Sequence, residues 1–505
     1  MKLSTVLALG ATGMAATAAA VWLKTTPAHG SGRSPDPAPA AALLAAPTPR
    51  PAAALVVERA HFTAGKTLMV EGRLGHPVLP ADQDSETFLY VDISADAAAR
   101  TTAPAPLDLA IVIDRSGSMK GRRLDNAMAA TKAAIGRLHD GDLVSVVTYD
   151  TRAEITVEPT VIDATSRARV LQQLARPRAG GDTCISCGVE TAMRLVPARP
   201  GRVSRILLLS DGFATAGVRD LGGFKTIAEN CRRMGASITT IGVDIDYDER
   251  ILAALSRESN GNHFFVRDPS GLATIFERET DALARTVAGA AELTIDLAPG
   301  VFVDQVFDRV TTSTGSQVVM PMGAFTAGEH KTALVRLRVP RGGAGDRPIA
   351  AVRLRYDDLV EQRPGACEGL LAAVATADTS QLSPLDGLVS ARVTRSETAA
   401  ALESANQLIR AGDLAQATTM LRERHALNEV ALRQARSAMP MAARGKLDAD
   451  FDRQQAALDQ AEQVFAPAAA APAGDGGGGA VPPTARPDVG AQMRTSQADA
   501  VDFGR

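Results

Sequence analysis

The residues best suited to chemistry lie in a short turn, Asp114–Met119 (DRSGSM), directly after the nearly apolar run Leu107–Ile113. The carboxylate of Asp114 and the hydroxyls of Ser116 and Ser118 occupy alternate positions. A tight turn can therefore aim all three oxygens at one point, and the glycine between the serines adds no bulk there. Ligands that are all oxygen select a hard cation, Mg²⁺ first, with Mn²⁺ or Ca²⁺ as alternatives. The turn predicts a divalent metal site.

Two more oxygen-bearing side chains follow the same pattern further along the chain. Thr183 ends the glycine-rich segment 180–183 (GGDT), and Asp211 follows the apolar run Ile206–Leu209. In an open α/β sheet, ligands bind beyond the carboxyl ends of the strands, where loops from neighbouring strands meet. Asp182, just before Thr183, could compete as a ligand. The predicted metal ligands are Asp114, Ser116, Ser118, Thr183 and Asp211.

These side chains also have less specific roles open to them. Ser116 and Ser118 could only cap the helix that follows, and Thr183 could cap the next one. Because Asp114 and Asp211 both stand at strand ends, the combination favours the metal site over simple capping.

The sequence offers little support for an enzyme. A haloacid-dehalogenase-type phosphatase needs a second Asp two residues after the first, where this chain has Ser116. A hydrolase elbow needs the pattern G-x-S-x-G, which does not surround Ser118. His263 lies in an apolar run, and we interpret it as a packed residue rather than a base. We predict no catalytic residues, and a hydrolase that activates water on the ion is the less favoured alternative.

Cys184 directly follows Thr183, where a helix is expected to begin, and Cys187 comes three residues later. Cα atoms three residues apart on a helix lie about 5 Å from each other, which is within disulfide range. Two buried thiols are the alternative, and a zinc site is disfavoured because Cys231 and Cys367 are remote in sequence. We hypothesise a disulfide that stiffens the metal-binding loop.

Between residues 105 and 288, buried-strand patterns alternate with helical ones. The apolar runs are Leu107–Ile113, Leu143–Val147, Ile206–Leu209 and Ile238–Val243. Strands that are apolar throughout are typical of parallel sheets with helices on both faces. We predict a doubly wound, mainly parallel, Rossmann-like α/β domain over residues 105–288.

Shorter strands with alternating polarity flank this domain. They occur in residues 55–104 and again in residues 289–384, for example Val335–Val339 and Val352–Tyr356. Neither set alone buries much apolar surface. We therefore predict one β-sandwich, formed by 55–104 and 289–384, into which the α/β domain is inserted.

The C-terminal part has a different character. Residues 385–466 show helical patterns with breaks at Gly412 and Pro440, which predict a helical hairpin or small bundle. Residues 467–505 begin with Ala, Pro and Gly, and we expect a disordered tail.

The order of these motifs resembles the von Willebrand factor type A (VWA) family. That family's metal-ion-dependent adhesion site consists of D-x-S-x-S, a Thr from a Gly-rich loop and an Asp after the fourth strand, and all five positions have counterparts here. The runs Ser210–Gly217 (SDGFATAG) and Ile241–Asp244 (IGVD) add to the resemblance. The flanking strands are similar to those of bacterial secreted members with a split sandwich. The resemblance implies that a partner protein's Asp or Glu completes the coordination of the ion.

The N-terminus suggests export. Residues 3–23 carry no charge and lie between Lys2 and Lys24, with Trp22 near the end. A run of this length fits either a cleaved signal peptide or a retained membrane anchor, so both interpretations of residues 1–24 stay open. Residues 25–54 form a Pro/Ala-rich linker. We expect the protein in the periplasm or cell envelope, with anchoring in the inner membrane by residues 3–23 as the alternative.

Composition limits the partners. The 505-residue chain has 54 Lys and Arg against 57 Asp and Glu, so it lacks the basic excess of a nucleic-acid binder. Its 4 cysteines are too few for a disulfide-built scaffold. We predict a metal-dependent protein-binding role in adhesion or scaffolding. An assembly factor working with an AAA+ ATPase is the alternative, and the export signal argues against it because such ATPases need cytoplasmic ATP.

Overall fold

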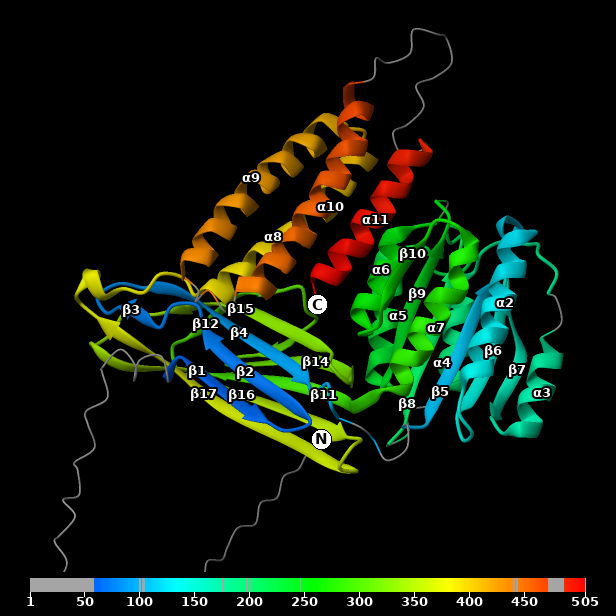
Figure 1. Ribbon diagram of the computed structural model, residues 1–505, viewed down its shortest axis with the longest axis horizontal. Coiled ribbons are helices and arrows are strands. Elements are labelled where there is room, and N and C mark those ends of the chain that lie inside the picture. The colour runs from blue at the N-terminus through cyan, green and yellow to red at the C-terminus, as the bar shows by residue number, and fades with distance from the viewer. Residues whose placement is uncertain are drawn as a thin grey trace, which may run out of the picture. The chain divides into compact units, whose positions relative to one another are not determined.

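A computed structural model describes residues 59–470 and 486–504, apart from gaps at 100, 102–104, 175–176, 197–198, 200, 246, 439–440 and 442–443. Within this part of the chain, two sheets and a helical region accompany a six-stranded α/β sheet (Figure 1). The expected export segment and the linker, residues 1–54, lie outside the described residues.

The α/β sheet has the strand order β10-β9-β8-β5-β6-β7. All neighbours pair in parallel except β7, which is antiparallel to β6. The strands are β5 (Leu107–Asp114), β6 (Leu143–Tyr149), β7 (Ala153–Val161), β8 (Val203–Ser210), β9 (Ala236–Val243) and β10 (His263–Val266). The helices are α2 (Arg122–Arg137), α3 (Ala164–Gln173), α4 (Ile185–Leu195), α5 (Leu221–Arg233), α6 (Glu249–Glu258) and α7 (Leu272–Ala284). The doubly wound, mainly parallel fold is confirmed.

The nearly continuous apolarity of β5, which Asp108 interrupts, follows from its central place in the sheet. Ile111 and Ile113 point to a core shared with helices α2, α3 and α7. Ala110 and Val112 point to the opposite core, with α4, α5 and α6. Because a strand buried on both faces has no solvent-exposed side, its sequence does not alternate between apolar and polar residues. Strand β5 ends at Asp114, and the neighbouring strand β8 ends at Ser210, directly before Asp211. These residues therefore lie at the same end of the sheet.

The sandwich draws strands from both sides of the inserted domain. One sheet has the order β1-β2-β4-β15-β12, and the other has the order β13-β14-β11-β16-β17-β3. The strands before the insertion are β1 (His61–Gly65), β2 (Leu68–Leu74), β3 (Val78–Pro80) and β4 (Ser85–Ala95). Those after it are β11 (Thr286–Leu297), β12 (Phe302–Phe307), β13 (Thr312–Thr314), β14 (Gln317–Thr326), β15 (His330–Val339), β16 (Gly345–Asp358) and β17 (Arg363–Thr376).

One apolar core fills the space between these two sheets. It includes Leu89 and Val91 from β4 together with Leu293 and Val352 from β11 and β16. Strand β4 pairs with β15 over ten residues, which joins the segment before the insertion to the segment after it. The β-sandwich of the predicted fold is therefore present.

In the described part of the C-terminal region, α-helices pack together (Figure 1). They are α8 (Gly387–Arg410), α9 (Leu414–Ala438), α10 (Arg444–Ala470) and α11 (Pro487–Phe503). Leu402, Leu421, Phe465 and Phe503 share one core. None of the described helices is long and apolar enough to cross a membrane.

The expectation of a disordered tail was wrong for residues 487–503. These residues form α11, in which Val489, Met493 and Phe503 are almost fully buried. The Gly- and Pro-rich composition just before this segment dominated the prediction. The helix is stabilised by packing against the bundle, and such tertiary stabilisation leaves only a weak local signal.

Candidate metal centre

Asp114 is held rigidly at the end of β5. Its Oδ1 accepts a hydrogen bond from the backbone N–H of Ser116 at 2.8 Å. Its Oδ2 accepts from Ser210 Oγ at 2.9 Å and from the hydroxyl of Tyr149 at 3.2 Å. The residue is fully buried. Three donors from three elements therefore fix the carboxylate in one orientation.

The predicted serine ligands form a continuous oxygen cluster with Asp211. Ser116 Oγ lies 3.0 Å from Ser118 Oγ, and Ser118 Oγ donates to Asp211 Oδ1 at 2.7 Å. Neighbouring oxygens around Mg²⁺, bound at 2.0–2.1 Å in an octahedron, are separated by about 3 Å. The spacing of these side chains therefore fits a shared small cation.

Thr183 reaches the same place from the loop before α4. The N–H of Gly117 donates to the carbonyl of Gly181 at 3.2 Å, which ties that loop to the Asp114 turn. A Cβ added to Gly212 would lie 3.5 Å from both Ser118 Oγ and Thr183 Oγ1. Both hydroxyls therefore face the small space beside Gly212. Asp182 is exposed, and its backbone N–H donates to Thr151 Oγ1 at 3.0 Å.

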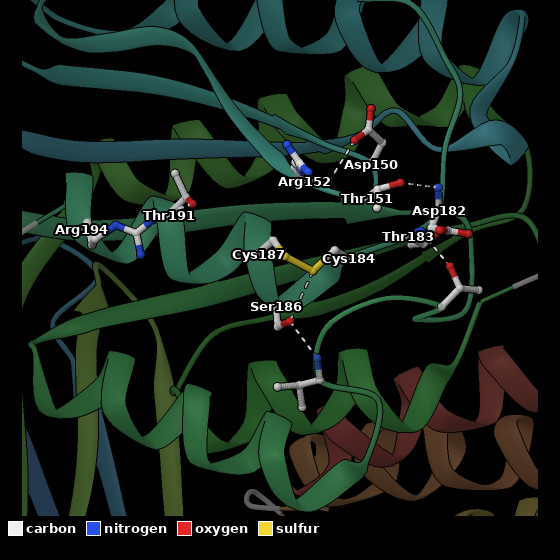
Figure 2. The surroundings of a disulfide bond; sticks show 12 residues. Asp150, Thr151, Arg152, Asp182, Thr183, Cys184, Ser186, Cys187, Thr191 and Arg194 are labelled. Carbon is white, nitrogen blue, oxygen red and sulfur yellow. Dashed lines mark hydrogen bonds between the residues drawn. A yellow bond between two sulfur atoms is a disulfide. The ribbon is translucent and has the colours of Figure 1, made fainter.

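A disulfide lies directly beneath this loop (Figure 2). Cys184 and Cys187 are joined, with Cα atoms 5.3 Å apart, as hypothesised from the sequence. Gly217 lies against the bond, because a Cβ there would be 2.5 Å from Cys184 Sγ. Its φ of +69° also favours glycine. The disulfide thus supports the loop that carries Thr183 and the end of the loop that begins at Asp211.

Two charged residues at the centre were given no role by the sequence analysis. Arg123, in the first turn of α2, donates from Nη1 to Asp211 Oδ2 at 3.0 Å and to the carbonyl of Ser118 at 3.1 Å. Its Nη2 binds Asp244 Oδ2. Asp244 lies within the noted IGVD run, but nothing local to that run indicates a partner 121 residues away.

The electrostatics of the centre favour a cation. Burial raises the pKa of Asp114 to about 6 against the hydrogen bonds from Ser116, and the charge of Asp211 adds to the rise. A dication held by both carboxylates would counter this cost, because an adjacent positive charge stabilises the ionised form. The donor set of two carboxylates and three hydroxyls is therefore chemically suited to a hard divalent ion.

The centre is accessible from solvent. Gly117 and Ser118 are exposed, whereas Asp114, Ser116 and Asp211 are buried behind them. Phe213, two residues after Asp211, has 54% of its surface exposed. An ion at this depth would be within reach of a group from another molecule.

His263 lies in β10, as a packed residue rather than a base. Its Nδ1 is 2.8 Å from Thr240 Oγ1, and desolvation by burial, helped by the charge of Arg257, lowers its pKa to about 3. No cluster of three or more His, Cys, Asp or Glu suited to a metal occurs in the described part of the chain. The candidate centre differs in kind, because three of its five predicted ligands are hydroxyls.

The fold agrees with comparisons to known proteins. The family model for the von Willebrand factor type A domain matches residues 108–278. Residues 108–278 form a VWA domain. Among solved structures, a von Willebrand factor type A protein from Catenulispora acidiphila aligns with a TM-score of 0.63 at 22% identity, covering 79% of this chain and 92% of that one. The ArnB paralog VWA2 from Sulfolobus acidocaldarius aligns with a TM-score of 0.55 at 17% identity, covering 86% and 98%. At these identities, the two structures establish the shared fold.

The alignments with proteins of similar sequence cover different parts of this chain. Protein sll0103 of Synechocystis is 24% identical over 334 residues, which are 63% of this chain and 77% of that protein. YfbK of Escherichia coli is 26% identical over 220 residues, 43% of this chain and 38% of that protein. Human inter-alpha-trypsin inhibitor heavy chain H2 is 29% identical over 168 residues, 31% of this chain and 18% of that protein. The match therefore spans well under half of YfbK and of the human heavy chain.

Proposed function

We propose that this protein binds another protein through a divalent ion held at the VWA domain. VWA domains commonly mediate protein–protein interactions, and they are typically non-catalytic. The observation that carries the proposal is the oxygen cluster Ser116–Ser118–Asp211, whose spacing suits one small cation and whose outer member, Ser118, is exposed.

The ion would be held by Asp114, Ser116, Ser118, Thr183 and Asp211. We propose Mg²⁺, with Mn²⁺ or Ca²⁺ as alternatives, because VWA domains hold a divalent metal at such a site and the donors are all hard oxygens. When bound, the ion supplies a Lewis-acidic position for an acidic side chain of the partner. The chain's own residues set the charge, since two carboxylates can only balance a dication and the hydroxyls add none.

The proposed setting is the cell envelope. The uncharged residues 3–23, between Lys2 and Lys24, support export by a signal peptide or retention by an anchor. The disulfide Cys184–Cys187 agrees with an oxidising compartment. Adhesion or scaffolding at the cell envelope is the role that these features favour together.

The experiment compares ion binding and partner capture in matched variants. Asp114→Ala should abolish Mn²⁺ and Mg²⁺ binding in calorimetry and should abolish the Mg²⁺-dependent crosslinks formed in native envelopes. Asp182→Ala removes an exposed carboxylate from the neighbouring loop and should leave both unchanged. Crosslinking that persists in a chelator, or in the Asp114 variant with its fold intact, would contradict the proposal.

A further inference from the structure

We propose that Arg123 and Asp244 set the net charge at the metal centre, and that they act in opposite directions. Arg123 weakens the hold on the ion and strengthens the ion's attraction for a partner carboxylate, whereas Asp244 does the reverse. The inference rests on the proposed function, because it concerns the same centre. It assigns two charge-tuning residues outside the five proposed ligands.

The position of Arg123 is the first observation. Its guanidinium donates to Oδ2 of Asp211 at 3.0 Å, while Oδ1 of the same carboxylate accepts from Ser118. Asp211 therefore directs one oxygen to the cluster and the other to a permanent cation. Partial burial opposes the charge on Arg123, but hydrogen bonds and charges from Asp244 and Asp211 raise its pKa. A guanidinium does not lose its proton at any physiological pH.

Asp244 is the second observation. It adopts a φ of +62°, which is uncommon outside glycine but tolerated by Asp and Asn. Its Oδ1 accepts from the N–H of Ile245 at 2.8 Å, and its Oδ2 binds Nη2 of Arg123. The backbone N–H of Ile245 thus orients the carboxylate of Asp244 toward Arg123. The negative charge of Asp244 offsets part of the positive charge that Arg123 brings to the centre.

Formal charges give the direction of each effect. Asp114 and Asp211 supply two negative charges, which a dication neutralises. Arg123 adds one positive charge next to Oδ2 of Asp211 through Nη1, and Asp244 counters that charge at Nη2 of the same guanidinium. The side chain of Arg123 is 24% exposed and that of Asp211 is fully buried, so water screens their interaction only in part. Removing Arg123 makes the centre more negative, and neutralising Asp244 makes it more positive.

Two charge variants test this prediction with the full chain and Mn²⁺ alone. Arg123→Gln should bind Mn²⁺ at least five-fold more tightly than the unaltered protein. Asp244→Asn, which suits the same backbone conformation, should bind it at least three-fold more weakly. Arg123→Lys keeps the positive charge and should stay within two-fold of the unaltered protein. Added salt should shrink all these differences, because screening weakens charge effects.

Acetate serves as the carboxylate probe on the Mn²⁺-loaded protein. Water-proton relaxation reports its entry, since acetate displaces water from Mn²⁺. Acetate should bind at least three-fold more weakly to Arg123→Gln and more tightly to Asp244→Asn. Charge tuning predicts that Mn²⁺ binding strengthens in Arg123→Gln and weakens in Asp244→Asn. If the two residues only supported the loop, both variants would bind Mn²⁺ more weakly.

The outcomes separate this inference from the proposed function. If the unaltered protein binds no Mn²⁺, the metal centre and this inference both fail. If it binds Mn²⁺ but both variants weaken binding, or Arg123→Lys behaves like Arg123→Gln, the charge inference alone is overturned. Melting curves in chelator establish that each variant is folded, and if Arg123→Gln does not fold, Asp244→Asn and Arg123→Lys decide the matter.

Discussion

The backbone N–H of Thr183 donates to Thr215 Oγ1 at 2.8 Å. In return, the N–H groups of Thr215 and Ala216 donate to the carbonyl of Thr183 at 3.0 and 3.2 Å. These bonds join the loop that presents Thr183 to the loop that begins at Asp211. Thr183, in the loop before α4, and Asp211, directly after β8, are thereby placed as a unit before any ion binds.

This connection predicts an effect of Thr215→Val on ion binding. Loss of the side-chain acceptor leaves the N–H of Thr183 unsatisfied, which costs about 1–3 kcal/mol. We expect lower stability in denaturant unfolding and several-fold weaker Mn²⁺ binding in calorimetry. Thr226→Val is the control, because Thr226 lies exposed on α5 and bonds only its own helix at 3.1 Å. Equal ion affinity for Thr215→Val and the unaltered protein would contradict preorganisation by this bond.

Gly217 allows a matched test of its contact with the disulfide. Gly217 and Gly201 have similar positive φ values, +69° and +73°. A Cβ at Gly217 would lie 2.5 Å from Cys184 Sγ and would also press on Ser186 Oγ, whereas a Cβ at Gly201 meets nothing within 4 Å. Gly201→Ala should therefore cost only the backbone strain, about 1–2 kcal/mol. Gly217→Ala should cost about 1–3 kcal/mol more, from overpacking. If Gly217→Ala and Gly201→Ala lower the free energy of unfolding equally in chemical denaturation, the close contact of residue 217 with the disulfide adds no cost and the prediction is wrong.

Burial of His263 predicts a pH dependence of stability. In the unfolded chain, histidine takes up a proton near pH 6.5, but in the folded protein burial lowers its pKa to about 3. Between these values the unfolded state binds more protons, so stability falls as the pH falls. The slope from this residue approaches about 1.4 kcal/mol per pH unit. His263→Gln should flatten urea-derived stability between pH 6.5 and 5, and an unchanged slope in this variant would contradict the prediction.

Glu249 forms a buried ion pair that joins α6 to the C-terminal helices. Arg410 Nε of α8 donates to Glu249 Oε1 at 3.1 Å, and Arg494 Nη2 of α11 lies 3.8 Å from Oε2. Removing one partner of a buried pair leaves an uncompensated charge, so Glu249→Gln should lower stability by about 3–5 kcal/mol. Glu258→Gln, on the same helix, loses a 3.8 Å contact with the exposed Lys225 and should cost less than about 1 kcal/mol. Similar losses of stability for both variants would contradict this ranking.

The parts of the molecule that were predictable are those specified by neighbouring residues. The nearly apolar run Leu107–Ile113 and the apolar run Ile206–Leu209 indicate strands buried on both faces, and this pattern predicts a parallel sheet. Once such a sheet is expected, Asp114 and Asp211 are placed at the same end of it, because both directly follow strands that run the same way. The structure pairs those strands side by side, β5 with β8. The cluster of Asp114, Ser116, Ser118 and Asp211 follows from that local information.

Other features were decided only by the tertiary structure. The bond from Arg123 to Asp244 joins residues 121 positions apart, and the bond from Arg494 to the carbonyl of Tyr247 joins residues 247 apart. Helix α11 follows a Gly- and Pro-rich segment, and its burial depends on surfaces supplied by other helices. The hydrophobic periodicity of the sequence indicates which face of a helix or strand is buried. It does not indicate which distant side chain pairs with a buried charge. That choice is made when the elements pack, because an unpaired charge is too costly to bury.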